Sequence, residues 1–305
     1  MKAVICARYG PPDVLKITQV EKPVPNNNEV LIKTAAATAH IGDTRIRRAD
    51  PFPVRLAFGL FKPKKNLIPG MEIAGIIESV GNNVAAFKPG DAVFAFTGFG
   101  LGGYAEYRCL PVKNGNPERN GLIALKPGNL SCDKRPAVPA GALTALKNLQ
   151  KADIRKGQSI LINGASGSLG TYAIQLAKYY GANVTAVCSA GNFELVLSLG
   201  ADKVIDYTRE DFTKTGDRYD VVYDAVMKSS RRRCKPILKT NGVFLNNSHL
   251  EKMTENDLLF LKDLIEQNKL RPVLDRTYSL NDIVEAHRYV DQGHKRGNVA
   301  ITICE

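Results

Sequence analysis

The chain has 305 residues, of which 44% are hydrophobic, and a formal net charge of +12. This length suffices for two domains of ordinary size with a substantial core. The sequence contains no run of roughly 18 apolar residues, and its start, Met1–Arg8, is too short and too early charged for a secretory signal. We therefore expect no membrane span and a cytoplasmic protein.

The basic charge is compatible with a nucleic-acid or anionic-membrane partner, but also with a solvated surface around an anionic cofactor. Its densest clusters, at 45–48, 62–65 and 231–235, are spread along the chain without interleaved aromatic residues. We therefore favour the solvated surface and expect no nucleic acid among the partners. The six cysteines form no Cys-x-x-Cys pair, so the sequence indicates neither a zinc cage nor a disulfide framework.

The first part of the chain is predicted to be rich in β-strands. Apolar runs alternate here with turn signals such as Gly10-Pro11-Pro12 and Lys88-Pro89-Gly90-Asp91. The expected strands lie at 2–7, 14–20, 29–37, 71–80, 91–96 and 104–110. The insertion at 50–66 is partly apolar and basic, and we expect it to form a loop or short helix over a cleft.

From about residue 126 the hydrophobic period becomes helical, and strands then alternate with helices. The expected helices lie at 136–151, 171–180 and 193–199, and the expected strands at 160–163, 183–187, 204–205, 220–225 and 242–245. This alternation predicts an α/β fold with a doubly wound parallel sheet. In the tail we expect helices at 255–268 and 282–290, and a last strand at 299–304 that returns to the first domain. The predicted domains are a dinucleotide-binding domain, 126–267, and a discontinuous domain, 1–125 with 268–305.

The most informative motif is a glycine-rich turn between a predicted strand and a predicted helix. Glycine at 164, 167 and 170 allows a tight turn, a close approach of the backbone to a pyrophosphate, and close packing of helix on strand. The N–H groups and the positive end of the helix dipole would favour the phosphates. We therefore predict a dinucleotide site; the alternative is a tight structural turn in another α/β sheet.

The end of the next predicted strand bears on the choice of cofactor. Sites that prefer NAD carry an acidic residue about 20 residues after the glycines, but no carboxylate follows this strand before Glu194. Ser189 and Asn192 can donate hydrogen bonds to a 2′-phosphate, and Arg209 and Lys203 could add charge. We therefore favour NADPH, with NADH possible; alternatively, Ser189 and Asn192 only cap the following helix.

Several segments together resemble the medium-chain dehydrogenase/reductase superfamily, and its zinc-independent NADPH:quinone oxidoreductase branch is the best match. The resemblance covers nearly the whole chain. It rests on signatures at 2–4, 70–75, 87–93, 103–107, 139–145, 200–207 and 223–224. It implies a GroES-like β-rich catalytic domain, a Rossmann domain, and NADPH-dependent reduction of quinones or α,β-unsaturated carbonyls.

Zinc-dependent members of this family place cysteine and histidine ligands in the segments that match 38–43 and 70–72. This chain has His40 but no cysteine in the first segment, and Met71 replaces the histidine before Glu72. Catalytic zinc needs three protein ligands, so we expect no zinc, although His40 and Glu72 could in principle bind a metal. Without a Lewis acid, reduction of a conjugated substrate is easier than oxidation of a simple alcohol.

The resemblance also implies roles for single residues. His40 stands where quinone oxidoreductases often carry asparagine near the nicotinamide ribose. It could donate to cofactor or substrate, supply a proton, or be a satisfied pocket histidine. Thr144 matches a threonine on the nicotinamide side, and Asn192 replaces a frequent lysine, which weakens the NADPH preference. The implied cofactor contacts are Gly164, Ala165, Gly167, Ser168, Leu169, Gly170, Ser189, Asn192, Tyr207, Phe244, Asn246 and Asn298.

The segment 246–253 is short, whereas proteins of this family generally have a longer segment there, often with strands that pair across a dimer. The resemblance implies a homodimer, whereas the deletion would also permit a monomer or a trimmed substrate pocket. Two further functions stay open: a zinc-free reductase of another activated carbonyl, and a cofactor-binding protein with an RNA-binding or structural role. Only the net charge supports the latter.

Overall fold

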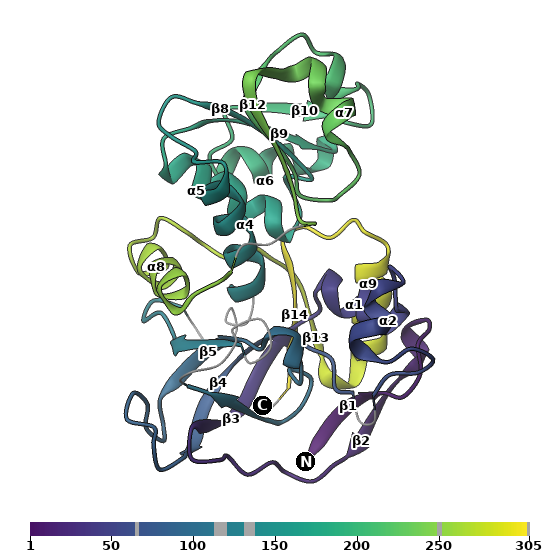
Figure 1. Cartoon of the computed structure of the whole chain (residues 1–305), viewed down its shortest axis with the longest axis vertical. Coiled ribbons are helices and arrows are strands. Elements are labelled where there is room, and N and C mark those ends of the chain that lie inside the picture. The colour runs from purple at the N-terminus through teal and green to yellow at the C-terminus, as the bar shows by residue number, and fades with distance from the viewer. Residues whose placement is uncertain (65–66, 113–120, 131–137, 249–251, 304–305) are drawn as a thin grey trace. The chain divides into compact units, whose positions relative to one another are not determined.

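The computed structural model describes residues 1–64, 67–112, 121–130, 138–248 and 252–303 (Figure 1). The chain divides into two compact units, each assembled from segments that are distant in the sequence. The first, called the β unit below, comprises Met1–Ala140, Thr254–Lys262 and Leu274–Glu305. The second, called the α/β unit, comprises Gly141–Met253 and Asp263–Val273.

Two sheets form the framework of the β unit. Their strands are β1 (Lys2–Cys6), β2 (Leu15–Gln19), β3 (Glu29–Thr38), β4 (Glu72–Val80), β5 (Ala92–Phe96), β6 (Tyr107–Pro111), β7 (Leu122–Leu125), β13 (Leu274–Ser279) and β14 (Asn298–Thr302). The seven-stranded sheet has the order β13-β14-β3-β4-β5-β7, with β6 paired to β3, and β1 and β2 form a separate pair. The pairing is antiparallel except between β13 and β14.

Branched apolar side chains from facing strands form the core of the β unit. Val30 and Ile32 of β3 and Ile73 and Ile77 of β4 are all buried in it, and Ile32 lies opposite Ile77 in the strand register. The predicted C-terminal strand is present as β14, which pairs with the end of β3. This pairing brings the tail of the chain beside the residues that lead into the first helix.

Helices α1 (Ile41–Arg48), α2 (Pro53–Phe58) and α9 (Ile283–Asp291) belong to the β unit, and residues of α8 (Glu255–Glu266) fall in both units. The short helix expected within 50–66 is α2, whereas α1 was not predicted. A capping box stabilises its start: His40 accepts a backbone N–H in the first turn, and Asp43 accepts the N–H of His40. Three arginines in its last turn complement the helix dipole.

A parallel sheet of five strands forms the framework of the α/β unit. Its strands are β8 (Ser159–Asn163), β9 (Asn183–Cys188), β10 (Lys203–Asp206), β11 (Tyr219–Asp224) and β12 (Leu238–Asn246). Their order is β10-β9-β8-β11-β12, and every pair is parallel. The predicted fold class is therefore confirmed: the strand order reverses beside β8, which in doubly wound sheets marks the ligand crevice at the carboxyl ends.

The α/β unit contains the helices α4 (Pro139–Lys151, apart from its first two residues), α5 (Ser168–Tyr179), α6 (Phe193–Ser198) and α7 (Arg231–Cys234). The helix predicted from Thr171 begins three residues earlier, because Gly167 is extended and serves as the N-cap. The helix predicted from 136 is described from Pro139 onward, and 136–137 lie outside the described residues. Within the described part of the chain, no helix is long and apolar enough to cross a membrane.

Candidate functional site

The predicted glycine-rich turn follows β8 and leads directly into α5. Gly164 has a φ of +81°, and a Cβ there would lie 2.3 Å from a methyl carbon of Val226. A Cβ on Gly170 would lie 2.3 Å from the carbonyl oxygen of Gly164, whereas a Cβ on Gly167 would approach that oxygen only to 3.4 Å. Gly164 and Gly170 are therefore required by the fold, while Gly167 leaves room for a ligand to approach.

The start of α5 has the features of an anion site. The N–H groups of Gly164 and Ala165 both donate to the carbonyl of Val187 over 3.1 Å, which holds the turn against β9. No described side chain caps the helix, whose first residues are Ser168 and Leu169. The N-terminal amides and the helix dipole of such a start favour a phosphate group.

The predicted residues for the adenosine end of the cofactor lie at the carboxyl ends of β9 and β10. Asn192 Nδ2 donates to Ser189 Oγ over 3.0 Å, so the structure brings these two residues together. Tyr207 follows β10 and is half exposed. Arg209 lies near this edge, with its Nε 3.7 Å from a carboxylate oxygen of Asp206. Lys203 instead pairs with Asp217.

Sequence reasoning missed the carboxylate at this edge. Asp206 is paired with Cys188 in the β10–β9 register, so it reaches the end of β9 from the neighbouring strand. Hydrogen bonds from the hydroxyl and N–H of Thr208 lower the pKa of Asp206, which is therefore ionised at neutral pH. Finding Asp206 requires knowing which residue of β10 lies beside the end of β9, and the sequence of β9 alone does not give this.

The residues predicted for the nicotinamide side lie on β12 and α4. Phe244 and Asn246 stand at the carboxyl end of β12, opposite β11. Thr144 lies in α4, where its carbonyl accepts Nδ2 of Asn148 over 3.0 Å. The same amide group donates to Asn247 over 3.2 Å. The α/β unit thus joins Thr144 to the end of β12 through Asn148 and Asn247.

In the β unit, His40 is held as a neutral hydrogen-bond donor. The N–H of Gly42 donates to its Nδ1 over 3.0 Å, so the ring proton lies on Nε2. This Nε2 is buried without a hydrogen-bond partner among the described residues. Burial, together with the charges of Lys295 and Arg45, lowers the pKa of His40 to about 3. His40 can therefore donate a hydrogen bond, but the alternative of a protonated imidazole as acid is disfavoured.

The two segments in which the resemblance led us to look for zinc ligands, 38–43 and 70–72, have other contacts. Both carboxylate oxygens of Glu72 accept hydrogen bonds, one from Thr38 Oγ1 and one from the N–H of Ala140. Met71, beside it, is buried. Among the described residues, no group of three or more His, Cys, Asp and Glu side chains could hold a metal ion. A thioether and an occupied carboxylate do not fit catalytic zinc.

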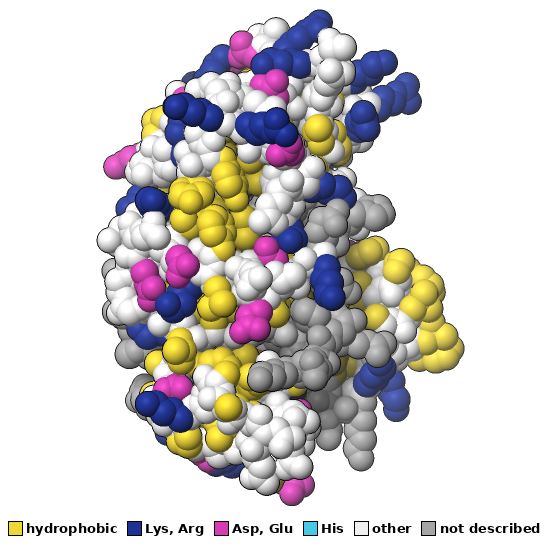
Figure 2. Space-filling view, turned by 60° about the vertical axis from the view of Figure 1, so that its left-hand side comes forward, with side chains coloured by type: hydrophobic (Ala, Val, Ile, Leu, Met, Phe, Trp, Pro, Cys, Tyr) yellow, Lys and Arg dark blue, Asp and Glu magenta, His cyan; other side chains and the backbone are white. Residues whose placement is uncertain are grey.

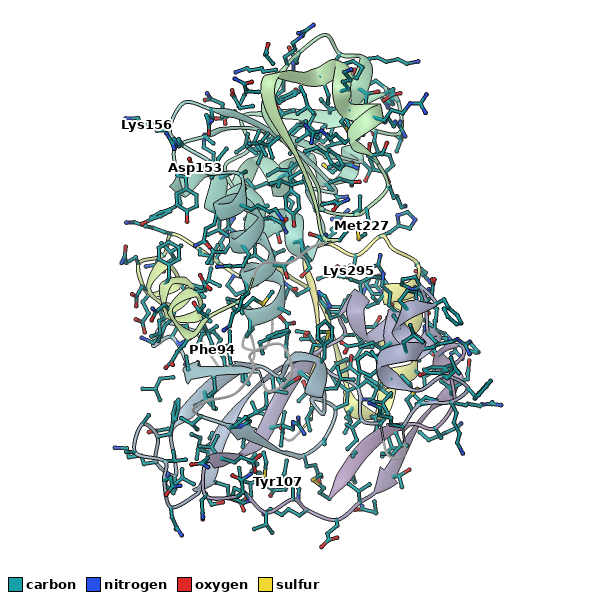
Figure 3. The ribbon with its side chains drawn as sticks, viewed as in Figure 1. Phe94, Tyr107, Asp153, Lys156, Met227 and Lys295 are labelled. Carbon is teal, nitrogen blue, oxygen red and sulfur yellow. The ribbon has the colours of Figure 1, made fainter. Side chains whose placement is uncertain are left out.

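Lys295 is a candidate that sequence reasoning did not identify. It lies on the segment between α9 and β14 (Figure 3), and its Nζ donates to the carbonyl of Gly297 over 2.5 Å. Burial lowers its pKa to about 8, against the opposing charges of Glu72 and Asp275. Asn298, which was predicted, is buried at the start of β14. The N–H of Ala39 donates to the next residue of β14, Val299, so Asn298 lies beside the approach to His40.

Asp43 positions this group of residues. Its carboxylate accepts the N–H of His40 over 3.1 Å, the N–H of Gly70 over 3.0 Å and the hydroxyl of Tyr104 over 3.1 Å. Burial raises the pKa of Asp43 to about 7 despite these donors. His287 Nε2 lies 3.2 Å from the same hydroxyl. Asp43 thus joins the start of α1 to the segment before β4.

Comparisons with known proteins agree with this architecture. Residues 26–117 match a family model described as "Alcohol dehydrogenase GroES-like domain". Residues 168–271 and 243–301 each match a model described as "Zinc-binding dehydrogenase". The β unit thus contains a GroES-like domain, and the α/β unit carries the Rossmann-type sheet.

Similar proteins extend over almost the whole chain. A 2-methylene-furan-3-one reductase of Solanum lycopersicum is 34% identical over 99% of this chain and 79% of its own length. An NADPH-dependent alkenal/one oxidoreductase of Arabidopsis thaliana is 32% identical with the same coverage. The solved structure of the quinone oxidoreductase from Coxiella burnetii has a TM-score of 0.84 at 28% identity, covering 100% of this chain and 99% of that one. The chain belongs to the medium-chain dehydrogenase/reductase superfamily.

Proposed function

We propose that this chain is an NADPH-dependent, zinc-independent reductase of quinones or α,β-unsaturated carbonyls. The observation that carries the proposal is a pair of hydrogen-bond donors in the β unit, the neutral His40 and the ammonium group of Lys295. Among the described residues, no set of side chains could hold a metal ion instead. Such donors stabilise charge on a carbonyl oxygen without a Lewis acid. The glycine-rich turn supports the cofactor, and the names of the relatives support the substrate class.

The proposed chemistry is a two-electron reduction. NADPH supplies a hydride when it is bound. Hydride added to the conjugated carbon of an enone leaves an enolate, and hydride added to a quinone leaves a phenolate-like oxygen. His40 donates a hydrogen bond from Nε2 to that oxygen, while Lys295 neutralises its charge and delivers the proton that completes the reduction. This assignment needs Lys295 to be protonated before the hydride arrives.

The proposed preference for NADPH rests on Ser189 and Asn192, and on Arg209, whose guanidinium lies beside the ionised Asp206 at the same edge and offsets its charge. Replacing Asn192 by aspartate would set a negative charge against the 2′-phosphate, so Asn192→Asp should raise the Kd for NADPH at least about tenfold and leave that for NADH nearly unchanged. The same change in Asn183, at the opposite end of β9, is the matched control. Equal losses for both cofactors would contradict the assignment.

The experiment that tests the proposal follows NADPH oxidation, with NADH in parallel, against ortho-quinones, para-quinones and 2-alkenals. Turnover of at least one class, faster with NADPH and at least about tenfold slower in Lys295→Met, is the expected result. Cofactor binding without turnover of any conjugated substrate would overturn the substrate class. Absence of binding of either cofactor would overturn the proposal as a whole.

A further inference from the structure

The insertion at 50–66 presents large hydrophobic side chains to solvent. Phe52 is 63% exposed, Leu56 72%, Leu60 45% and Phe61 88%. These four residues are called the apolar tip below. Figure 2 shows hydrophobic side chains gathered on one projecting region of the surface, with Lys and Arg side chains beside it. Exposed apolar patches of a few hundred Å² are often functional.

The backbone under the apolar tip is held by hydrogen bonds. The N–H of Gly59 donates to Arg55 over 2.8 Å, and the N–H of Lys64 donates to Phe58 over 2.9 Å. The hydroxyl of Tyr9 donates to the carbonyl of Gly59 over 2.7 Å. The Phe58 side chain is buried, in contrast to those of the apolar tip. Exposure of the apolar tip is therefore a property of a folded segment.

Apart from Asp50 at its start, the charged residues of this insertion are all basic. Residues 51–64 contain Arg55, Lys62 and Lys64 but no aspartate or glutamate, and both lysines are exposed. The rim of the apolar tip therefore complements a negatively charged surface. The cationic run at 231–235, in contrast, has no exposed large hydrophobic residue within it.

We propose that the apolar tip, with Lys62 and Lys64, docks on a membrane that contains anionic lipids. Aromatic and aliphatic side chains enter the boundary between headgroups and acyl chains, and flanking lysines remain with the anionic headgroups. This surface goes beyond the proposed reductase activity and does not depend on it. It departs from the expectation of a merely solvated basic surface, because side-chain exposure in a folded tip cannot be read from the sequence.

The size of the apolar tip favours a lipid surface over a folded protein partner. Its four side chains expose on the order of 500 Å², taking about 200 Å² for a fully exposed large hydrophobic residue. A standard protein interface needs about 800 Å² from each partner. A lipid surface sets no such minimum, since the strength of attachment scales with the buried apolar area and with the attraction of basic residues to anionic lipids.

Vesicle co-sedimentation of the full chain tests this proposal. Vesicles of phosphatidylcholine alone are compared with an equimolar mixture of phosphatidylcholine and phosphatidylglycerol, at low and at high salt. The wild type should bind the mixed vesicles at least about tenfold more than the neutral ones. Leu56→Ser with Phe61→Ser, and separately Lys62→Glu with Lys64→Glu, should each reduce that binding about tenfold. High salt should weaken it.

A matched control separates the apolar tip from net charge. Arg231→Glu with Arg232→Glu makes the same change in charge at two exposed residues elsewhere and should retain vesicle binding. Equal loss in this control, or wild-type binding in the tip variants, would overturn the proposal. The proposal would also be overturned if the tip variants bound vesicles normally and changed only the KM for a water-soluble quinone. The same holds if they changed only the concentration dependence of dimer formation, measured by light scattering. Unchanged melting temperatures show that each variant is folded.

Discussion

The glycine-rich turn needs glycine for two different reasons: Gly170 is needed for packing within the turn, and Gly167 is needed to leave room for the cofactor. A Cβ on Gly170 would collide with the backbone of the turn, so Gly170→Ala should lower the free energy of unfolding by about 2 kcal/mol. Gly167 has a φ of −78° and more space, so Gly167→Ala should cost less than about 1 kcal/mol but raise the Kd for NADPH at least tenfold. Urea unfolding and cofactor titration measure the two effects. A stable Gly170→Ala variant would show that the turn is not packed as described.

Lys295 predicts how the reductase rate depends on pH. Its pKa of about 8 means that the ammonium form prevails below pH 8, so kcat should fall as the pH rises through that value. The groups that face it are Glu72 and Asp275, whose charges favour the ammonium form, and His40, which is neutral above about pH 3. Lys295→Met should abolish this fall in kcat near pH 8 and slow the reaction about 100-fold at pH 7.

Lys295→Arg is the matched variant, because arginine stays charged throughout this range. It should retain part of the rate and lose the fall near pH 8. If Lys295 only binds the cofactor, Lys295→Met would instead raise KM for NADPH and leave kcat and its pH profile unchanged.

At the scale of elements, α1 and α9 are joined by a buried ion pair. Arg47 is fully buried and pairs with Asp291, whose side chain is 20% exposed. Nε and Nη1 of Arg47 have no hydrogen-bond partner among the described residues. Asp291→Ala would leave this cation buried without a counter-charge, so it should lower the free energy of unfolding by about 3 kcal/mol or more. Arg47→Met with Asp291→Leu should recover most of that loss.

Glu285→Ala provides the control for the buried pair. It removes an exposed ion pair with Arg288 on the same helix and should change the free energy of unfolding by less than about 1 kcal/mol. Thermal or urea unfolding measures all three variants. Equal effects of Asp291→Ala and Glu285→Ala would show that burial does not determine the strength of the pair.

The same elements show which part of the fold the sequence could predict. The parallel strands β8, β9 and β11 carry short apolar runs and are almost entirely buried, as is typical of a parallel sheet that is covered on both faces. α1 has few apolar residues and depends on its cap and on Asp291, which is distant in sequence. β13 is largely polar and half-buried, and only its pairing with β14 makes it a strand. Local patterns carry no information about such partners.

At the scale of the whole molecule, the residues of the candidate site also fall into two groups: those that a local sequence pattern predicts and those that only the folded structure brings into place. The glycine-rich turn is local in sequence and was predicted with its geometry. Lys295 and Asp206 reach their positions through the folding of β14 near His40 and of β10 beside β9, so neither could be predicted from spacing. The family resemblance assigns roles only to residues within the quoted signatures, and Lys295 lies in none of them. Its burial and the charges of Glu72 and Asp275 around it identify it in the structure.

The proposed independence from zinc can be tested on the intact protein. Because Met71 is buried and Glu72 is already bound by Thr38 and Ala140, dialysis against a chelator should leave kcat/KM within about twofold of its starting value if, as proposed, the reaction uses no Lewis acid. Elemental analysis of the active enzyme should find far less than one zinc ion per chain. Met71→His restores a histidine to the ligand position and should still not make turnover depend on zinc, because both carboxylate oxygens of Glu72 already accept hydrogen bonds, which leaves two free ligands where catalytic zinc needs three. Loss of activity on chelation that added zinc restores would show instead that a metal takes the role assigned to Lys295.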